Sequence, residues 1–167
     1  MQLLVVRHGI ATEREEWARE HSDDTDRPLT AEGKKKMKDC AKGLRALLPR
    51  LDVVATSPLT RAMQTAVILA KAYDTGEPVT AEPLTPGEHP PALATWLRGH
   101  DTKKSVAIVG HEPGLGAIVS WLTAGSERSF LELGKGGACL LDLGERIDAR
   151  EAMLLWVVRP SHLRALG

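Results

Sequence analysis

The residues best suited to chemistry in this sequence follow short apolar runs that are typical of buried strands. They are Arg7, His8, Arg61 and His111. A lone histidine after a strand is more often structural, but four cationic or cationisable groups converging on one place would repel one another. An anion among them removes the repulsion, and arginine binds phosphoryl oxygens with a planar pair of donors. The sequence therefore predicts a pocket that binds phosphate or sulfate.

The elements that must position these residues can be read from the apolar pattern. Five runs predict strands, at residues 3–6, 53–55, 106–109, 138–143 and 153–158, and a weaker segment at 78–81 is a sixth candidate. The first, third and fifth runs are nearly continuous in Val, Ile and Leu, which is typical of strands covered on both faces.

Helical patterns lie between these strands. Apolar residues recur at three- and four-residue steps after Thr30, which is a suitable N-cap, and again from Met63, Leu93 and Leu115. Strands that alternate with helices predict a three-layer α/β/α sandwich around a mainly parallel sheet of about six strands. The connection at 144–152 is too short for a helix, so one of the last two strands is expected to be antiparallel. In such sheets ligands bind at the carboxyl ends of the strands, where the four residues would meet.

Composition narrows the class of protein. The 167 residues are expected to form one domain, residues 1–167, and 22 basic residues balance 22 acidic ones. A net charge of zero argues against a protein that binds nucleic acid or an anionic membrane surface. The two cysteines lack Cys-x-x-Cys spacing, and the histidines lack paired metal spacing, so no metal and no cofactor are expected. No signal peptide or membrane span is evident, which favours a cytoplasmic protein.

Three motifs in a fixed order resemble those of a known family. Arg-His-Gly stands at 7–9 after the first strand, Thr-Ser-Pro-Leu-Thr-Arg begins at 56, and Gly-His-Glu-Pro stands at 110–113. This set is similar to the motifs of the histidine phosphatase superfamily, the phosphoglycerate mutase-like enzymes. The resemblance implies a phosphoglycerate mutase-like fold.

Further features resemble the small SixA-type phosphohistidine phosphatases within that superfamily. Arg-Pro-Leu-Thr at 27–30, followed by Gly33, is similar to a segment that precedes their first long helix, and the tail at 156–160 is also similar. Residues 67–110 must supply several predicted elements and leave little for an inserted cap. The expected domain therefore has no large cap over its site.

The resemblance implies a role for each candidate residue. His8 is the expected nucleophile, held neutral with a free Nε2 lone pair. Arg7 and Arg61 are expected to bind the phosphoryl oxygens, and His111 to donate a hydrogen bond to them, best as an imidazolium. Arg27 is a further candidate for contact with phosphate or substrate, although a surface arginine before a proline turn would look the same.

The sequence does not decide which residue acts as general acid. Glu82 and Glu112 are candidates, and the reaction could also proceed without a positioned acid. A phosphohistidine substrate makes an acid less necessary, because its imidazole leaves readily once protonated.

The leading hypothesis is a phosphatase that hydrolyses phosphohistidine on a phosphorelay or phosphocarrier domain, through a covalent phosphohistidine intermediate on His8. The partner would thus be a phosphorylated protein domain, which an open site can admit. The first alternative is a small-molecule phosphomonoesterase acting on a sugar phosphate or similar metabolite. The second is a non-catalytic module that binds phosphorylated partners.

Overall fold

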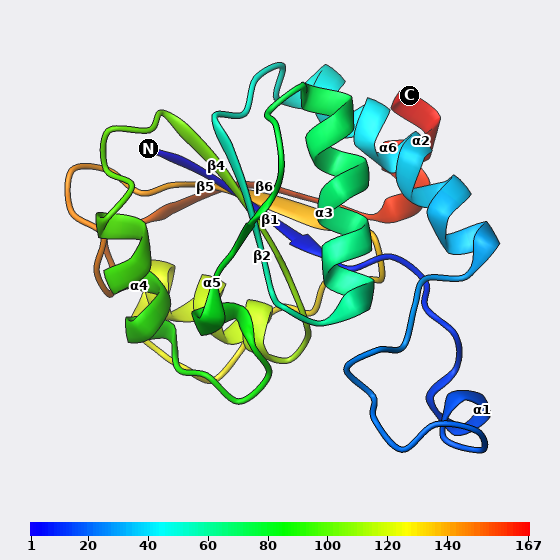
Figure 1. The fold of residues 1–167 in the computed structure, drawn as a ribbon. Helices are drawn as coiled ribbons and strands as arrows, with labels where there is room; N and C mark the ends of the chain where they lie inside the picture. Colours follow the sequence, from blue (N-terminus) through cyan, green and yellow to red (C-terminus); the bar gives the residue numbers. More distant parts are fainter.

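A single six-stranded sheet runs through the computed structural model, which describes residues 1–167 (Figure 1). Its strands are β1 (Gln2–Arg7), β2 (Val53–Thr56), β3 (Val79–Thr80), β4 (Ser105–Gly110), β5 (Ala138–Asp142) and β6 (Met153–Val158). Their order is β3-β2-β4-β1-β5-β6. β1, β4, β2 and β3 pair in parallel, whereas β5 is antiparallel to both β1 and β6. The predicted mainly parallel sheet with one antiparallel strand is confirmed.

Helices cover both faces of this sheet. They are α1 (Arg14–Trp17), α2 (Ala31–Leu47), α3 (Thr60–Tyr73), α4 (Pro90–Arg98), α5 (Gly114–Ala124) and α6 (Pro160–Leu166), with a 3₁₀ turn, η1 (Glu82–Leu84). Leu4 and Val6 of β1 pack in one core cluster with α2, α3 and α6, whereas Leu3 and Val5 pack in another with α4 and α5. The alternation of side chains along β1 thus separates two cores, and the predicted three-layer sandwich is confirmed.

One strand differs from its prediction. The run at 153–158 was expected to be covered on both faces, but Met153, Leu155 and Val157 of β6 are exposed. β6 lies at the edge of the sheet and pairs only with β5, with a register shift between Leu140 and Leu141. A continuous apolar run therefore does not distinguish a central strand from an edge strand.

Packing at the start of α2 explains why residue 33 is a glycine. The side chain of Thr30 accepts a hydrogen bond of 2.9 Å from the Gly33 backbone, as predicted for an N-cap. A Cβ at Gly33 would collide with the carbonyl oxygen of Ile10. Glycine at this position therefore allows α2 to pack directly against the backbone that follows the Arg-His-Gly motif.

Residues 12–28, which include α1, project from the body as a small lobe at the lower right of Figure 1. An isolated bridge between Ala11 and Leu29 closes the base of this lobe. No helix of the molecule combines the length and the apolar character that crossing a membrane would require.

Candidate active site

The two histidines come together because their strands are neighbours. His8 follows β1 and His111 follows β4, and these strands pair in parallel from Gln2 with Ser105 to Arg7 with Gly110. Their ring centroids are 5.1 Å apart, and both side chains are buried, with 6% and 7% exposure. The carboxyl ends of two adjacent parallel strands therefore place both imidazoles at one point of the rim.

His8 is oriented by its own backbone neighbourhood. Its Nδ1 lies 2.7 Å from the carbonyl oxygen of Gly9. Since a carbonyl oxygen only accepts, Nδ1 must carry the proton and Nε2 keeps its lone pair. Burial, together with the positive charges of Arg61, Arg7 and Arg27, lowers the pKa of His8 to about 4, although the bond to Gly9 opposes the shift. His8 is therefore a neutral imidazole at neutral pH, as a phosphoryl acceptor requires.

Ser57, which follows β2, fixes the second imidazole. Its Oγ lies 2.9 Å from His111 Nε2 and accepts a hydrogen bond of 3.3 Å from the Leu59 backbone. Because the Leu59 amide occupies one lone pair of this oxygen, we assign the hydroxyl proton to His111 Nε2, which leaves the proton of a neutral His111 on Nδ1. Burial, followed by the proximity of the ionisable His8 and the positive charge of Arg61, lowers the pKa of His111 to about 3. The expected imidazolium is thus not the form of the free protein, and His111 has one N–H to donate.

Arg61 and Arg27 are buried beside these rings, and several donors of the site lack hydrogen-bond partners. Arg61 is 3% exposed and Arg27 is 7% exposed. The Nε atoms of Arg7 and Arg61 and the Nδ1 atom of His111 are buried without a hydrogen-bond partner. A buried donor without a partner costs about 1–3 kcal/mol. Three such donors around one neutral imidazole form a site that an anion would complete.

Asp24, which sequence reasoning missed, joins the arginines. Its carboxylate accepts a hydrogen bond of 2.7 Å from Arg27 Nε and lies 3.1 Å from Arg61 Nη2. Its backbone carbonyl also accepts from Arg61 Nη1 at 2.9 Å. Burial would raise the pKa of Asp24, but the bond from Arg27 and the charges of Arg61, Arg27 and Arg14 lower it. The lobe is therefore tied to the site, and the Asp three residues before Arg27 was the available signal.

Arg27 lies inside the site rather than on the surface. Its Nη1 donates to the carbonyl oxygen of Thr12 at 2.7 Å, and its charge contributes to the lowered pKa of both His8 and His111. The surface alternative for Arg27 is therefore wrong.

Neither of the two candidate general acids, Glu112 and Glu82, is free to reach the site. Both carboxylate oxygens of Glu112 accept backbone hydrogen bonds, from Gly116 at 2.9 Å and from Leu133 at 2.8 Å. Glu82 is exposed and does not line the cavity beside His111. Glu112 therefore supports the start of α5 and the loop before β5, and neither glutamate is placed as a general acid.

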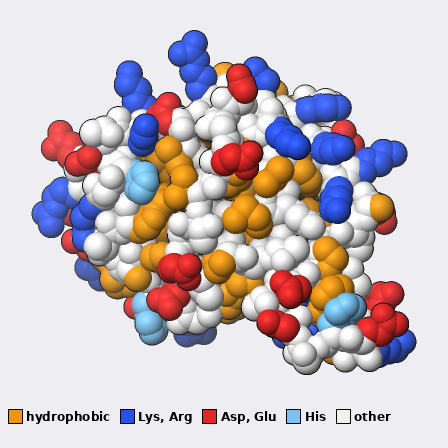
Figure 2. All heavy atoms as spheres, viewed as in Figure 1, with side chains coloured by type: hydrophobic (Ala, Val, Ile, Leu, Met, Phe, Trp, Pro, Cys, Tyr) orange, Lys and Arg blue, Asp and Glu red, His pale blue; other side chains and the backbone are white.

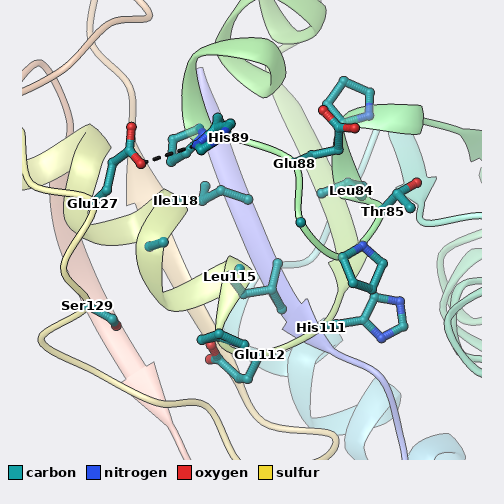
Figure 3. Close-up of a pocket in the computed structure, with 17 residues that line it drawn as sticks. Leu84, Thr85, Glu88, His89, His111, Glu112, Leu115, Ile118, Glu127 and Ser129 are labelled. Atoms are coloured by element: carbon teal, nitrogen blue, oxygen red, sulfur yellow. Dashed lines mark hydrogen bonds and ion pairs between the residues drawn. The ribbon is translucent and has the colours of Figure 1, made fainter.

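A cavity of about 280 Å³ opens beside His111, between the loop at 83–90 and the start of α5 (Figure 3). Thr85 and Leu84 lie on the side of the first loop, and Glu127 approaches from the opposite side. Between α3 and β4 the chain forms only β3, η1 and α4, so no large cap is inserted there.

Comparison with known proteins identifies the family. Residues 3–84 match the model of the histidine phosphatase superfamily (branch 1). The chain belongs to the histidine phosphatase superfamily. It is accordingly a phosphatase of this superfamily.

Relatives and solved structures agree with this assignment. An uncharacterized protein of Picosynechococcus sp. is 36% identical over 152 residues, which cover 89% of this chain and 90% of that protein. The protein histidine phosphatase SixA, solved in complex with tungstate, has the same fold with a TM-score of 0.84, 23% identity and coverage of 98% of this chain and 99% of that one. Alpha-ribazole phosphatase from Shigella flexneri has a TM-score of 0.70, 17% identity and coverage of 96% and 97%. The fold is thus shared by phosphatases named for different substrates.

Proposed function

We propose that this phosphatase hydrolyses phosphohistidine on a protein, through a phosphohistidine intermediate on His8. The observation that carries the proposal is the neutral His8, with Nε2 free, beside three buried donors that lack partners. In this proposal Arg7, Arg61 and His111 bind the phosphoryl oxygens, and Arg27 adds positive charge behind them. The SixA structure with bound tungstate, a tetrahedral oxyanion, supports the same use of this fold.

The proposed reaction has two displacements at phosphorus. His8 Nε2 donates its lone pair to the phosphorus atom while the substrate P–N bond breaks, and its electron pair leaves with the substrate imidazole, which takes a proton from solvent. A water oxygen then attacks the phosphoryl group on His8, the P–N bond breaks with its electron pair returning to His8 Nε2, and phosphate leaves as the water proton is released to solvent. His8 is neutral again at the end of the cycle.

Neither Glu82 nor Glu112 is placed as a proton donor, which favours this substrate over an alkyl phosphate. An alkoxide needs a positioned proton donor, whereas an imidazole can be protonated from water before it leaves. Glu112 is held by backbone donors and Asp24 is ion-paired with two arginines, so neither supplies that proton. The proposed reaction needs no metal, because the arginines neutralise the phosphoryl charge.

A small-molecule phosphomonoesterase remains the second candidate, because the alpha-ribazole phosphatase shares the fold. The test compares kcat/KM for a phosphohistidine-bearing carrier domain with kcat/KM for a panel of sugar phosphates. We expect the carrier domain to be the better substrate by orders of magnitude, and acid-labile phosphate to be trapped on His8 in wild type but not in His8→Asn. Faster hydrolysis of a sugar phosphate would contradict the proposal, and full turnover by His8→Asn would contradict the mechanism.

A further inference from the structure

A second cavity extends the site on the side of Arg7. It measures about 560 Å³ and shares Glu112, Pro113 and Ser129 with the cavity beside His111. Arg7, at the end of β1, lines this second cavity, and His111, directly after β4, lines the first. The two cavities adjoin through these shared residues, and together they are called the trench; His111 lines one part of it and Arg7 lines the other.

The charged side chains of this trench are mainly acidic. Apart from Arg7 and His111, they are Glu88, Glu112, Glu127, Glu132 and His89. Glu127 lies 3.4 Å from His89, and Glu132 lies 3.3 Å from Arg7 Nη1. Glu88 has no such partner and is exposed. A substrate with a second anionic group beside its phosphoryl group would be repelled here, whereas a cationic neighbour would be attracted.

Apolar surface accompanies these carboxylates. Phe130, 58% exposed, lines the cavity beside Arg7, whereas Leu115 and Ile118 lie beside the other cavity (Figure 3) but are themselves buried. Lysine and arginine combine an alkyl stem with a charged head, and an aromatic face attracts that head within about 6 Å. The trench thus offers both kinds of contact that a basic side chain makes.

The wall that presents Phe130 is held in place before substrate arrives. The Phe130 backbone donates to Ser120 Oγ at 3.1 Å, and the Leu133 backbone donates to Glu112 at 2.8 Å. Arg7 Nη1 donates to the carbonyl oxygen of Leu133 at 2.6 Å. The loop at 126–133 is therefore anchored both to α5 and to the site itself.

We propose that this trench selects phosphoryl groups carried on a polypeptide segment with lysine or arginine beside the phosphorylated residue, and rejects carriers with a neighbouring carboxylate. The proposal rests on the proposed function, whose substrate class it narrows. Glu88 and Glu127 are the specificity-determining residues beside His111, and Phe130 and Glu132 are those beside Arg7.

The test uses two phosphohistidine peptides that differ only in their flanks, which are lysines in one and glutamates in the other. We expect kcat/KM to favour the lysine peptide by about tenfold at low salt, and the preference to shrink at about 0.5 M salt. The double variant Glu88→Gln/Glu127→Gln should reduce the preference to about threefold or less without changing hydrolysis of phosphoramidate. Equal rates for the two peptides, or a preference for glutamate, would overturn the proposal.

Glu77→Gln/Glu151→Gln is the matched control, because both residues are exposed and lie outside the trench. It removes the same charge, so an equal loss of preference in this control would show a general charge effect and overturn the proposal.

Phosphoethanolamine and phosphoglycolate separate the charge selection from the choice of phosphohistidine. If the protein releases no phosphate from either peptide but hydrolyses phosphoethanolamine faster than phosphoglycolate, the charge selection by the trench is supported and the proposed function is contradicted. Hydrolysis of phosphoglycolate faster than that of phosphoethanolamine would contradict the charge selection by the trench, whatever the peptides show.

Discussion

At the scale of single residues, the site depends on hydrogen-bond partners that fix the orientation of the histidines and arginines. Ser57 sets the proton on His111, the Gly9 carbonyl sets the proton on His8, and Asp24 aligns two buried arginines. None of these contacts has to touch the phosphoryl group. Each limits the orientations that a reacting or binding side chain can adopt, which reduces the reorganisation needed during reaction.

Asp24→Asn separates positioning from charge. Removing a negative charge beside the arginines should tighten binding of inorganic phosphate if Asp24 acts only as a counter-ion. If Asp24 positions Arg27 and Arg61, we expect kcat/KM to fall by about tenfold and the phosphate inhibition constant to rise. Steady-state kinetics with phosphate as inhibitor measure both quantities.

Asp26→Asn is the control for that variant, since Asp26 is exposed and pairs with no arginine. Asp24→Glu should recover part of the activity. Tighter phosphate binding with unchanged kcat/KM in Asp24→Asn would show that Asp24 has no positioning role.

The fall of kcat/KM at acid pH should report the pKa of His8. Because its pKa is lowered to about 4, His8 stays neutral as the pH falls from 8 to 5, and kcat/KM should not follow the titration of an ordinary histidine. Activity should be lost only as the pH falls through about 4, when His8 takes a proton. An inflection of kcat/KM near pH 6.5 with a substrate that does not titrate there would contradict a neutral, buried His8.

At the scale of elements, the strand ends decide which residues meet. The apolar runs predicted where the chain reaches the rim, so His8, Arg61 and His111 could be expected together from the sequence. Partners such as Ser57 with His111, or Asp24 with Arg61, depend on side-chain geometry between distant segments, which no local pattern encodes. The exposure of β6 was also missed, because the order of strands is a property of the assembled sheet.

The contact of α2 with the motif loop can be tested at Gly33. A Cβ there would meet the carbonyl oxygen of Ile10, so we expect Gly33→Ala to destabilise the protein by about 2 kcal/mol or more. Denaturant unfolding measures the change. In α5, Gly114 has nothing within 4 Å of an added Cβ, so Gly114→Ala should change the free energy of unfolding by less than about 1 kcal/mol. Equal effects of the two substitutions would contradict the close packing of α2.

At the scale of the whole molecule, a net charge of zero conceals an uneven distribution. The lobe at 12–28 is rich in red carboxylates at the lower right of Figure 2, whereas the surface around α2 at the upper right is rich in blue. Composition alone therefore excluded a basic binding protein but gave no indication of the acidic trench beside the site.

The two buried histidines make global stability depend on pH. Their pKa values in the folded protein, about 4 and about 3, lie below the ordinary value of 6.5, so the unfolded chain binds protons first on acidification. We expect the free energy of unfolding to be highest above pH 6.5 and to fall as the pH decreases toward about 4. Thermal unfolding across this range should show a shallower fall for His111→Asn. His162→Asn, at an exposed position, should keep the wild-type slope, and an unchanged slope in His111→Asn would contradict the assigned burial effect.

The reversed direction of β5 has a consequence for His8, the proposed nucleophile. Parallel strands bring their last residues to the catalytic rim, but an antiparallel one brings its first residues there, so the turn before Ala138 arrives beside the end of β1. The Gly136 amide donates to the carbonyl oxygens of both Arg7 and His8, each at 3.1 Å, and Gly136 has a φ of 81°, which favours glycine. The peptide units on either side of the His8 α-carbon are thereby held by a tight turn more than a hundred residues away in the chain. A side chain at Gly136 would weaken this hold on His8 from outside the pocket.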